Sequence, residues 1–337
     1  MNYIWSLICA TDYVSNFQLK TKVSAVVAAA LLSIITIQAA TFASVELIPA
    51  QAKQGQTVEV RVLPGDSASP DDPAAASGTV SGEPSPAVLF RKKKYKLFPV
   101  SGAPEQPVPG PNSGSRALIG VPANLPPGTY SIKIGDLEKK LTVAAGGFGI
   151  QTLRLPPGKD NFVASPGEEA AVAAAKATVS SKQLWNGKFI RPVQSRVSST
   201  FGLRRRVNGK LLSDYFHSGM DFAAATGTPV KAVQSGKVVL VGRSWKLHGN
   251  TVCIDHGQGV LSFYIHLSKI FVKDGDMVET GQKIGAVGST GRANGPHLHF
   301  SITTMPLIPV TGSPRFFDED LPGSAGSLPA LKNLSNC

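Results

Sequence analysis

Residues 249–267, GNTVCIDHGQGVLSFYIHL, contain the pattern that decides the fold of the C-terminal half of the chain. Apolar residues gather there in short runs, and glycines separate these runs at close intervals. The pattern extends outward in both directions through a series of apolar positions, which comprises Val230, Ala232, Val238, Val239, Leu240, Val252, Ile254, Phe263, Ile265, Ile284 and Val287. Short strands joined by glycine turns, without a helical period, predict a compact antiparallel β-domain. We place this domain at residues 191–309 and expect a flexible tail over residues 310–337.

Histidine and aspartate occur in this half at two spacings that bring side chains onto one face of a strand. In HSGMD, residues 217–221, the spacing is four, and Gly219 favours a turn and strand over a helix. Side chains alternate along a strand, so the first and last side chains of this motif point the same way. In HLH, residues 297–299, a spacing of two again places both rings on one face and turns Leu298 toward the core.

Two imidazoles and one carboxylate that converge on one face form a three-ligand zinc site with an open fourth position. Such an open position is typical of catalytic sites, because water or a substrate carbonyl can bind the metal there. Hydrolysis also requires a group that accepts a proton and later donates one to the leaving amine. His266 is one candidate for this group, and His297 is the other if only His299 of its pair binds zinc.

Other reactive side chains have no such spacing. His256 follows a predicted strand and is interpreted as a turn residue, and His248 receives no role. The chain has three cysteines, which imply no disulfide framework, and it lacks the C-x-x-C spacing of a cysteine zinc site. Cys253 is predicted to be a small buried apolar residue.

The preceding segment, residues 44–147, is predicted to form a β-sandwich. Val58, Val60 and Val62 alternate with polar residues, which is the period of half-buried strands. Two stretches rich in Pro, Ser, Gly and Asp are predicted loops, at about residues 64–86 and 103–115. The fold class is therefore mainly β, with two β-domains.

A linker, residues 148–190, is predicted to join the two domains through an alanine-rich helix from Pro166 to Lys182. Ser165 can cap the first free N–H groups of this helix, and Glu168 completes a capping box. Because alanine offers little apolar bulk, we expect the helix to be a spacer rather than a core element.

The N-terminal segment, residues 1–43, has the composition of an export signal. Two lysines precede an apolar run from Val23 to Ile37, and small residues follow as far as Ala43. We predict a cleaved signal peptide or, alternatively, an uncleaved membrane anchor through residues 23–43. Either way, the rest of the chain is expected to be exported, to the periplasm, the cell envelope or the extracellular space.

The net charge of the chain gives only a general indication of its binding partners. Lys and Arg number 34 against 22 Asp and Glu, and this net charge of +12 favours a polyanion such as an anionic cell-wall polymer. No nucleic-acid-binding signature occurs, so nucleic acid is not an expected partner, and no specific protein partner is predicted. The basic run from Arg91 to Lys96 is interpreted as an edge strand whose lysines block edge pairing, in preference to a wall-binding patch.

From Ser199 to Phe300 the chain resembles the lysostaphin-type (LytM-like) zinc metalloendopeptidases, which cleave peptidoglycan peptides. The resemblance rests on the two motifs above and on further segments in the family's order, which are STFGLR at 199–204, GTPV at 227–230, GNTVCIDHG at 249–257, YIHL at 264–267, GDMVETGQKIG at 275–285 and GPHLHF at 295–300. The stretch from Arg205 to Phe216 is longer and more basic than the family pattern and could shape a substrate groove. The N-terminal half loosely resembles immunoglobulin-like domains.

By this resemblance His217, Asp221 and His299 bind one Zn²⁺ per chain, His297 is the general base, and His266 assists it. The implied function is hydrolysis of peptide bonds in peptidoglycan, in cross-bridges or stem peptides, for cell-wall remodelling or lysis.

Two functions of other classes compete with this one. The first is a non-catalytic protein that binds the wall or activates another hydrolase; such relatives usually lack a zinc ligand, whereas all three are present here. The second is a biotinyl or lipoyl carrier domain, which the glycine-rich stretch from Asp274 to Gly291 resembles. A carrier domain would have no use for the histidines.

Overall fold

The computed structural model describes residues 42–64, 87–100, 114–158, 162–304 and 308–310. The predicted leader up to Thr41, most of the two predicted loops, and the tail beyond Val310 lie outside the described residues. The chain divides into the units Met1–Thr41 and Phe42–Cys337. As predicted, the described part is mainly β, with a single described helix. Among the described residues, no helix is both long enough and apolar enough to span a bilayer.

Strands of the N-terminal half form two sheets that share one apolar core. The first sheet has four strands in the order β1 (Phe42–Ile48), β3 (Thr57–Pro64), β7 (Ser115–Gly120) and β6 (Phe98–Pro99). The second has five in the order β2 (Gln51–Lys53), β9 (Leu137–Ala144), β8 (Gly128–Ile134), β4 (Ala87–Phe90) and β5 (Lys93–Lys96). Val60 of β3 lies in the same core as Ile132 of β8, which is the arrangement of a β-sandwich. The likeness to immunoglobulin-like domains stays a prediction.

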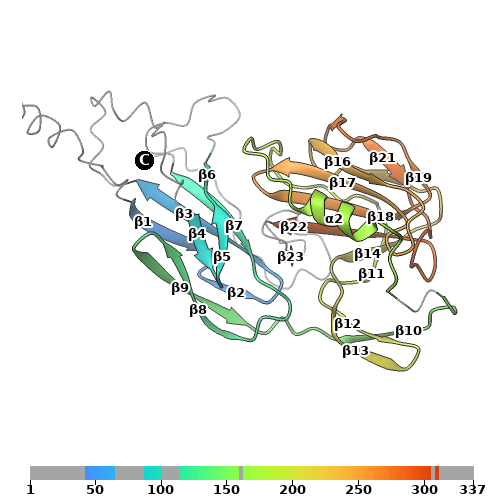
Figure 1. Cartoon of the computed structure of the whole chain (residues 1–337), viewed down its shortest axis with the longest axis horizontal. Coiled ribbons are helices and arrows are strands. Elements are labelled where there is room, and N and C mark those ends of the chain that lie inside the picture. Colours follow the sequence, from blue (N-terminus) through green and yellow to red (C-terminus); the bar gives the residue numbers. More distant parts are fainter. Residues whose placement is uncertain (1–41, 65–86, 101–113, 159–161, 305–307, 311–337) are drawn as a thin grey trace, which may run out of the picture. The chain divides into compact units, whose positions relative to one another are not determined.

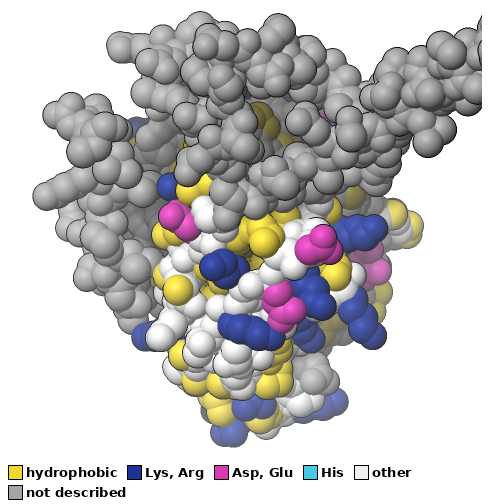
Figure 2. Space-filling view, turned by 90° about the vertical axis from the view of Figure 1, so that its left-hand side faces the viewer, with side chains coloured by type: hydrophobic (Ala, Val, Ile, Leu, Met, Phe, Trp, Pro, Cys, Tyr) yellow, Lys and Arg dark blue, Asp and Glu magenta, His cyan; other side chains and the backbone are white. Residues whose placement is uncertain are grey.

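The basic run from Arg91 to Lys96 overlaps an edge strand. β5 is the last strand in the order of its sheet, and its three lysines are exposed while Tyr95 is buried. Figure 2 shows lysine and arginine side chains interspersed with acidic and apolar ones on the face that it draws. The edge position of β5 and its exposed lysines agree with side chains that discourage edge pairing.

The C-terminal half is built on an eight-stranded sheet in which every pairing is antiparallel. Its order is β11 (Val197–Ser199), β14 (Met220–Ala223), β22 (His297–Thr304), β18 (Val260–Leu267), β17 (Asn250–Gly257), β16 (Gly236–Gly242) and β20 (Met277–Val278), with β23 (Ile308–Val310) beside β22. This sheet is the antiparallel β-domain that the glycine-spaced apolar runs predict.

Two three-stranded sheets accompany the central one. The first is ordered β15 (Pro229–Lys231), β21 (Lys283–Ala286) and β19 (Lys269–Ile270). The second is ordered β10 (Ile150–Leu153), β12 (Arg204–Val207) and β13 (Lys210–Phe216). In this second sheet β10, from the predicted linker, pairs in parallel with β12.

The described helix differs from its prediction in length, capping and packing. Helix α2 (Glu168–Lys176) ends before the predicted Lys182, and its N-cap is Gly167, without a side-chain cap hydrogen bond. The hydroxyl of Ser165 instead accepts a hydrogen bond from the backbone N–H of Lys246. The other half of the predicted capping box is present, because the carboxylate of Glu168 accepts a hydrogen bond from the backbone N–H of Ser165 at 2.7 Å. Val172 packs in an apolar cluster with side chains of β16, β17 and β18, and α2 lies against these strands in Figure 1. The prediction of a spacer is therefore wrong, because the helix covers one face of the central sheet.

Strand register in the central sheet determines which side chains can meet. Asp221 of β14 pairs with His299 of β22, and Ile265 of β18 pairs with His299 on the other side. Leu298 is fully buried in the main core of this half. Because side chains alternate, His297 and His299 emerge on the opposite face of β22 from Leu298.

Candidate metal centre

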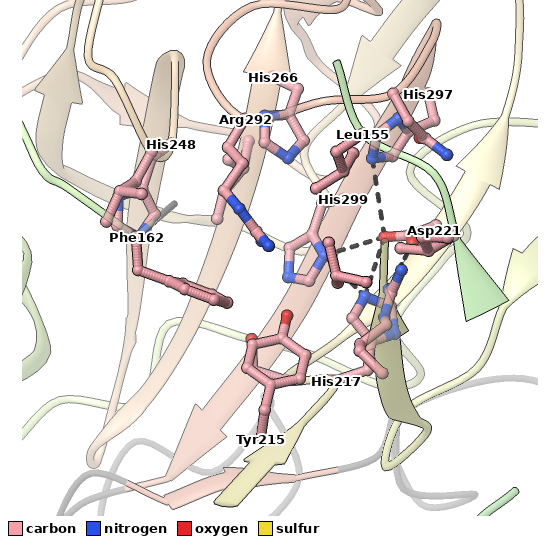
Figure 3. A pocket seen from close by; sticks show the side chains of 17 residues that line it. Leu155, Phe162, Tyr215, His217, Asp221, His248, His266, Arg292, His297 and His299 are labelled. Atoms are coloured by element: carbon pink, nitrogen blue, oxygen red, sulfur yellow. Dashed lines mark hydrogen bonds and ion pairs between the residues drawn. The ribbon is translucent and has the colours of Figure 1, made fainter. Parts of the chain in front are cut away.

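Three side chains bring their donor atoms together at the bottom of a pocket (Figure 3). Nε2 of His217 lies 3.0 Å from Oδ1 of Asp221 and 3.0 Å from Nδ1 of His299. Nδ1 of His299 lies 2.9 Å from the same carboxylate oxygen. In a tetrahedral zinc site with bonds of about 2.0–2.1 Å, neighbouring ligand atoms are about 3.3 Å apart. The triangle therefore has nearly the size of one face of such a site.

The protonation of the rings also suits a metal. Nδ1–H of His217 donates to the carbonyl of Thr200 at 2.8 Å, which leaves Nε2 as the ring nitrogen that can bind a metal. Burial lowers the pKa of His299 to about 4, despite the opposing effect of Asp221. Two nitrogen lone pairs and a carboxylate at these distances repel one another unless a cation lies among them. The donor set thus fits one zinc ion.

Arg205 binds the oxygen of Asp221 that faces away from the triangle. Its Nη2 lies 3.1 Å from Oδ2, and both side chains are about nine-tenths buried. Although burial acts to raise the pKa of Asp221, His217 and His299 hold it well below its ordinary range. Asp221 is therefore a carboxylate at neutral pH, with Oδ1 directed to the metal position. Arg205 begins the basic stretch that was predicted to shape a substrate groove, but its contact with Asp221 follows from strand pairing rather than from spacing.

His266 and His297 lie side by side at the edge of the cluster. Their ring centroids are 4.9 Å apart, and Nε2 of His297 lies 3.9 Å from Oδ1 of Asp221. Nδ1–H of His266 donates to the carbonyl of Thr290, and Nδ1–H of His297 donates to that of Gly295, each at 2.8 Å. Each ring is therefore left with a basic Nε2. Burial, together with His297 and His299, lowers the pKa of His266 well below its ordinary value, which keeps this ring neutral.

The structure thus brings all five predicted site residues into one pocket of about 220 Å³. The described residues that line it also include Arg205 and Tyr215, which belong to the stretch predicted to shape a substrate groove. Others had no predicted place in the site, among them Leu155, Phe162, His248 and Arg292. Leu155 and Phe162 come from the predicted linker, and Arg205 and Tyr215 come from the β12–β13 hairpin. No motif in the sequence marks Leu155, Phe162, His248 or Arg292, since they derive from segments that meet only after folding.

Two remaining predictions concern β17. His256 is not a turn residue: it is a buried residue of β17, with Nδ1 bonded to the carbonyl of Ser235 and Nε2 to the hydroxyl of Ser262, each at 2.8 Å. Burial lowers the pKa of His256 to about 4. Cys253 is buried against α2, as predicted.

Comparison with known proteins identifies the domain. Residues 215–309 match the model of peptidase family M23. The chain is 45% identical over 115 residues to the peptidoglycan DD-endopeptidase ShyA of Vibrio cholerae, which is 33% of this chain and 26% of ShyA. It is 43% identical over 121 residues to the DD-carboxypeptidase/endopeptidase Mpg of Neisseria meningitidis, which is 35% of this chain and 27% of Mpg. The chain thus spans about a quarter of the length of these curated relatives.

A solved structure is also similar to this chain. The catalytic domain of lysostaphin from Staphylococcus simulans is 36% identical to this chain, with a TM-score of 0.31, and the match covers 36% of this chain and 89% of that one. Peptidases of family M23 are zinc metalloproteases, and the cluster of His217, Asp221 and His299 fits their metal. Residues 215–309 of this chain therefore form a domain of peptidase family M23.

Proposed function

We propose that this chain is a zinc-dependent endopeptidase that hydrolyses peptide bonds in bacterial peptidoglycan, outside the cytoplasm. The observation that carries the proposal is the triangle of donor atoms from His217, Asp221 and His299, with the rings of His266 and His297 beside it. A structural zinc site would close its fourth position with another protein ligand. Here the adjoining space is a pocket, which leaves room for a substrate.

Zinc bound there supplies a Lewis acid, which polarises the scissile carbonyl and acidifies water. His297 accepts a proton at Nε2, since its Nδ1–H is engaged with Gly295. His266 stands ready to share this role or to stabilise the developing negative charge, because its Nε2 is also basic. The lowered pKa of His266 favours its neutral form before the reaction. The proton that these histidines accept later passes to the leaving amine.

Peptidoglycan is the proposed substrate because of the names of the relatives. ShyA is named a peptidoglycan DD-endopeptidase, and Mpg is named a DD-carboxypeptidase/endopeptidase. Action on the wall agrees with the expected export signal in residues 1–43. We propose that residues 23–43 either are removed or anchor the protein in the membrane. We further propose the division into a sandwich (44–147), a linker (148–190) and a peptidase domain (191–309).

The alternative is a wall-binding protein or an activator of another hydrolase. Clearing of purified peptidoglycan by the purified protein in a zymogram distinguishes the two. The proposed enzyme clears the wall and carries about one zinc per chain, as measured by mass spectrometry. His217→Ala and treatment with ortho-phenanthroline abolish clearing, whereas the non-chelating isomer meta-phenanthroline has no effect.

Two results would overturn the proposal. If His217→Ala clears the wall as well as the wild type does, the zinc mechanism is wrong. If the protein never clears the wall but stimulates a second hydrolase, it is an activator. Mass analysis of the released muropeptides then shows whether D,D cross-links or glycine bridges are cut.

A further inference from the structure

Two loops beside the metal centre are held together through their backbones. The backbone N–H of Arg292 donates to the carbonyl of Leu247 at 3.0 Å. A Cβ atom on Gly291 would lie only 2.4 Å from the backbone nitrogen of Gly249, so the loops pack too closely there for a side chain. The backbone N–H of His266 donates to the carbonyl of His248, also at 3.0 Å. His248 and Arg292 are therefore fixed next to each other and to the proposed catalytic histidines.

A fully buried carboxylate from the linker helix orients His248. Oε1 of Glu168 accepts hydrogen bonds from Nδ1–H of His248 at 2.6 Å and from its backbone N–H at 2.8 Å. The same carboxylate accepts a further bond from the backbone N–H of Leu247 at 3.2 Å. Because Nδ1 is engaged, the ring edge that can reach a ligand in the pocket is the one with Nε2.

Arg292 is likewise held in one orientation. Its guanidinium carbon lies 3.9 Å from the centroid of the Phe162 ring, and the guanidinium hydrogen-bonds to Tyr215. Figure 3 shows the guanidinium pointing into the pocket, between His248 and Phe162 on one side and His299 on the other. A planar guanidinium fixed in this way suits the two oxygens of a carboxylate.

The balance of charge in the pocket favours an anionic ligand. The described residues that line it include two guanidinium groups, on Arg205 and Arg292, and one carboxylate, on Asp221. The carboxylate of Asp221 is already paired with Arg205 and contributes to the metal position. Glu168 does not line the pocket, because it is buried behind His248. The lining thus carries a net positive charge even before zinc adds its own.

We propose that Arg292 and the Glu168-oriented His248 form a subsite that binds a free carboxylate of the substrate close to the scissile bond. This inference rests on the proposed peptidoglycan peptidase function and specifies its substrate class. Stem peptides carry free carboxylates on their acidic residues and at their C-termini, whereas a glycine bridge has none within its backbone. The subsite therefore selects stem-peptide cross-links over glycine bridges.

The test compares a cross-linked stem-peptide dimer that has all its carboxylates free with dimers in which each carboxylate is converted in turn to a primary amide. Wild-type protein should lose about 10- to 100-fold in kcat/KM for one particular amide, mainly through KM, because a charge-assisted pair is lost. Arg292→Gln and His248→Asn should lower kcat/KM for the free dimer to a similar degree. They should also cut the free and amidated dimers equally well.

The variants separate this role from a purely structural one. Asn at position 248 keeps a donor near the place of Nδ1 for Glu168 but removes Nε2, so the loop stays anchored. Arg243→Gln removes the same charge from an exposed residue of the same loop and should keep full discrimination between the dimers. Circular dichroism and zinc content should match the wild type in all three variants.

Two outcomes would overturn the inference, and they are distinguishable from each other. If the wild type cuts every amidated dimer as fast as the free one, the carboxylate subsite is refuted while the peptidase function stands. If zinc-loaded protein cuts no dimer at all, the proposed function fails and the subsite falls with it.

Discussion

Replacing Arg205 with glutamine should weaken zinc binding by about 10- to 100-fold without unfolding the domain. In the structure, Nη2 of Arg205 lies 3.1 Å from Oδ2 of Asp221, and both side chains are about nine-tenths buried. A hydrogen bond between charged groups contributes about 1.5–3 kcal/mol. Since about 1.4 kcal/mol corresponds to a tenfold change in affinity, the loss lies in the stated range.

A second effect of the same substitution acts in the opposite direction. Arg205 repels a nearby divalent cation, and its removal would by itself strengthen zinc binding. We expect orientation to dominate, because Oδ1 of Asp221 already lies 3.0 Å and 2.9 Å from the ligand nitrogens of His217 and His299. Without Arg205, the carboxylate of Asp221 can rotate away from this position. Zinc binding must then supply the free energy that returns the carboxylate to it, which lowers the affinity for zinc.

Competition with a chromophoric zinc chelator at neutral pH measures this affinity directly. Arg206→Gln is the matched control, because Arg206 is the next residue of β12 and its side chain is exposed on the other face. Arg205→Lys should be intermediate, since it keeps the charge but not the planar fork. If Arg205→Gln binds zinc as tightly as the wild type or more tightly, while Asp221→Asn loses zinc, the orienting role of Arg205 is refuted.

Three further predictions concern catalysis and stability. His297→Ala should lower kcat by about 10²–10⁴-fold with unchanged zinc content, because it removes a proton acceptor but no ligand; a parallel loss of zinc would identify His297 as a ligand instead. Removal of zinc by chelation should lower the melting temperature in calorimetry, since zinc binds the folded state, and an unchanged melting temperature would contradict the site. Burial, the largest single influence on Glu168, acts to raise its pKa, but the hydrogen bonds that its carboxylate accepts together hold the pKa below 4.5. The ionised carboxylate therefore stabilises the fold above pH 4.5, and this stabilisation is lost as the pH falls through the lowered pKa. Glu168→Gln should therefore unfold more easily than the wild type at neutral pH in urea titrations, by a margin that shrinks below pH 4.5; a constant margin would refute this linkage.

Much of the metal centre could be predicted from the sequence because local spacing controls it. A strand period of two fixes the relation of His297 to His299, and the antiparallel partner strand then brings Asp221 opposite His299. The fold class followed from the same period, since apolar runs broken by glycines leave few alternatives to short strands. These are short-range relations, which a single sequence displays directly.

Other features depend on long-range packing and could not be read from spacing. Glu168 and His248 are eighty positions apart, and only the docking of α2 on the sheet brings them together. The alanine-rich helix was mistaken for a spacer because Val172 and Ala175 are its only buried apolar side chains among the described residues. His256 was mistaken for a turn residue because the following glycines mask a strand that continues to Gly257.

The buried Glu168 has a consequence for how this protein can be divided into domains. A boundary drawn where the family match begins, at residue 215, or where the glycine-spaced pattern begins, near residue 191, severs the carboxylate from the loop that it anchors. Any chimera that transplants only the region after such a boundary inherits the zinc ligands but not the geometry of His248. The portable unit therefore starts upstream of Ser165, and exchange of modules among related enzymes is expected to carry α2 along with the sheet.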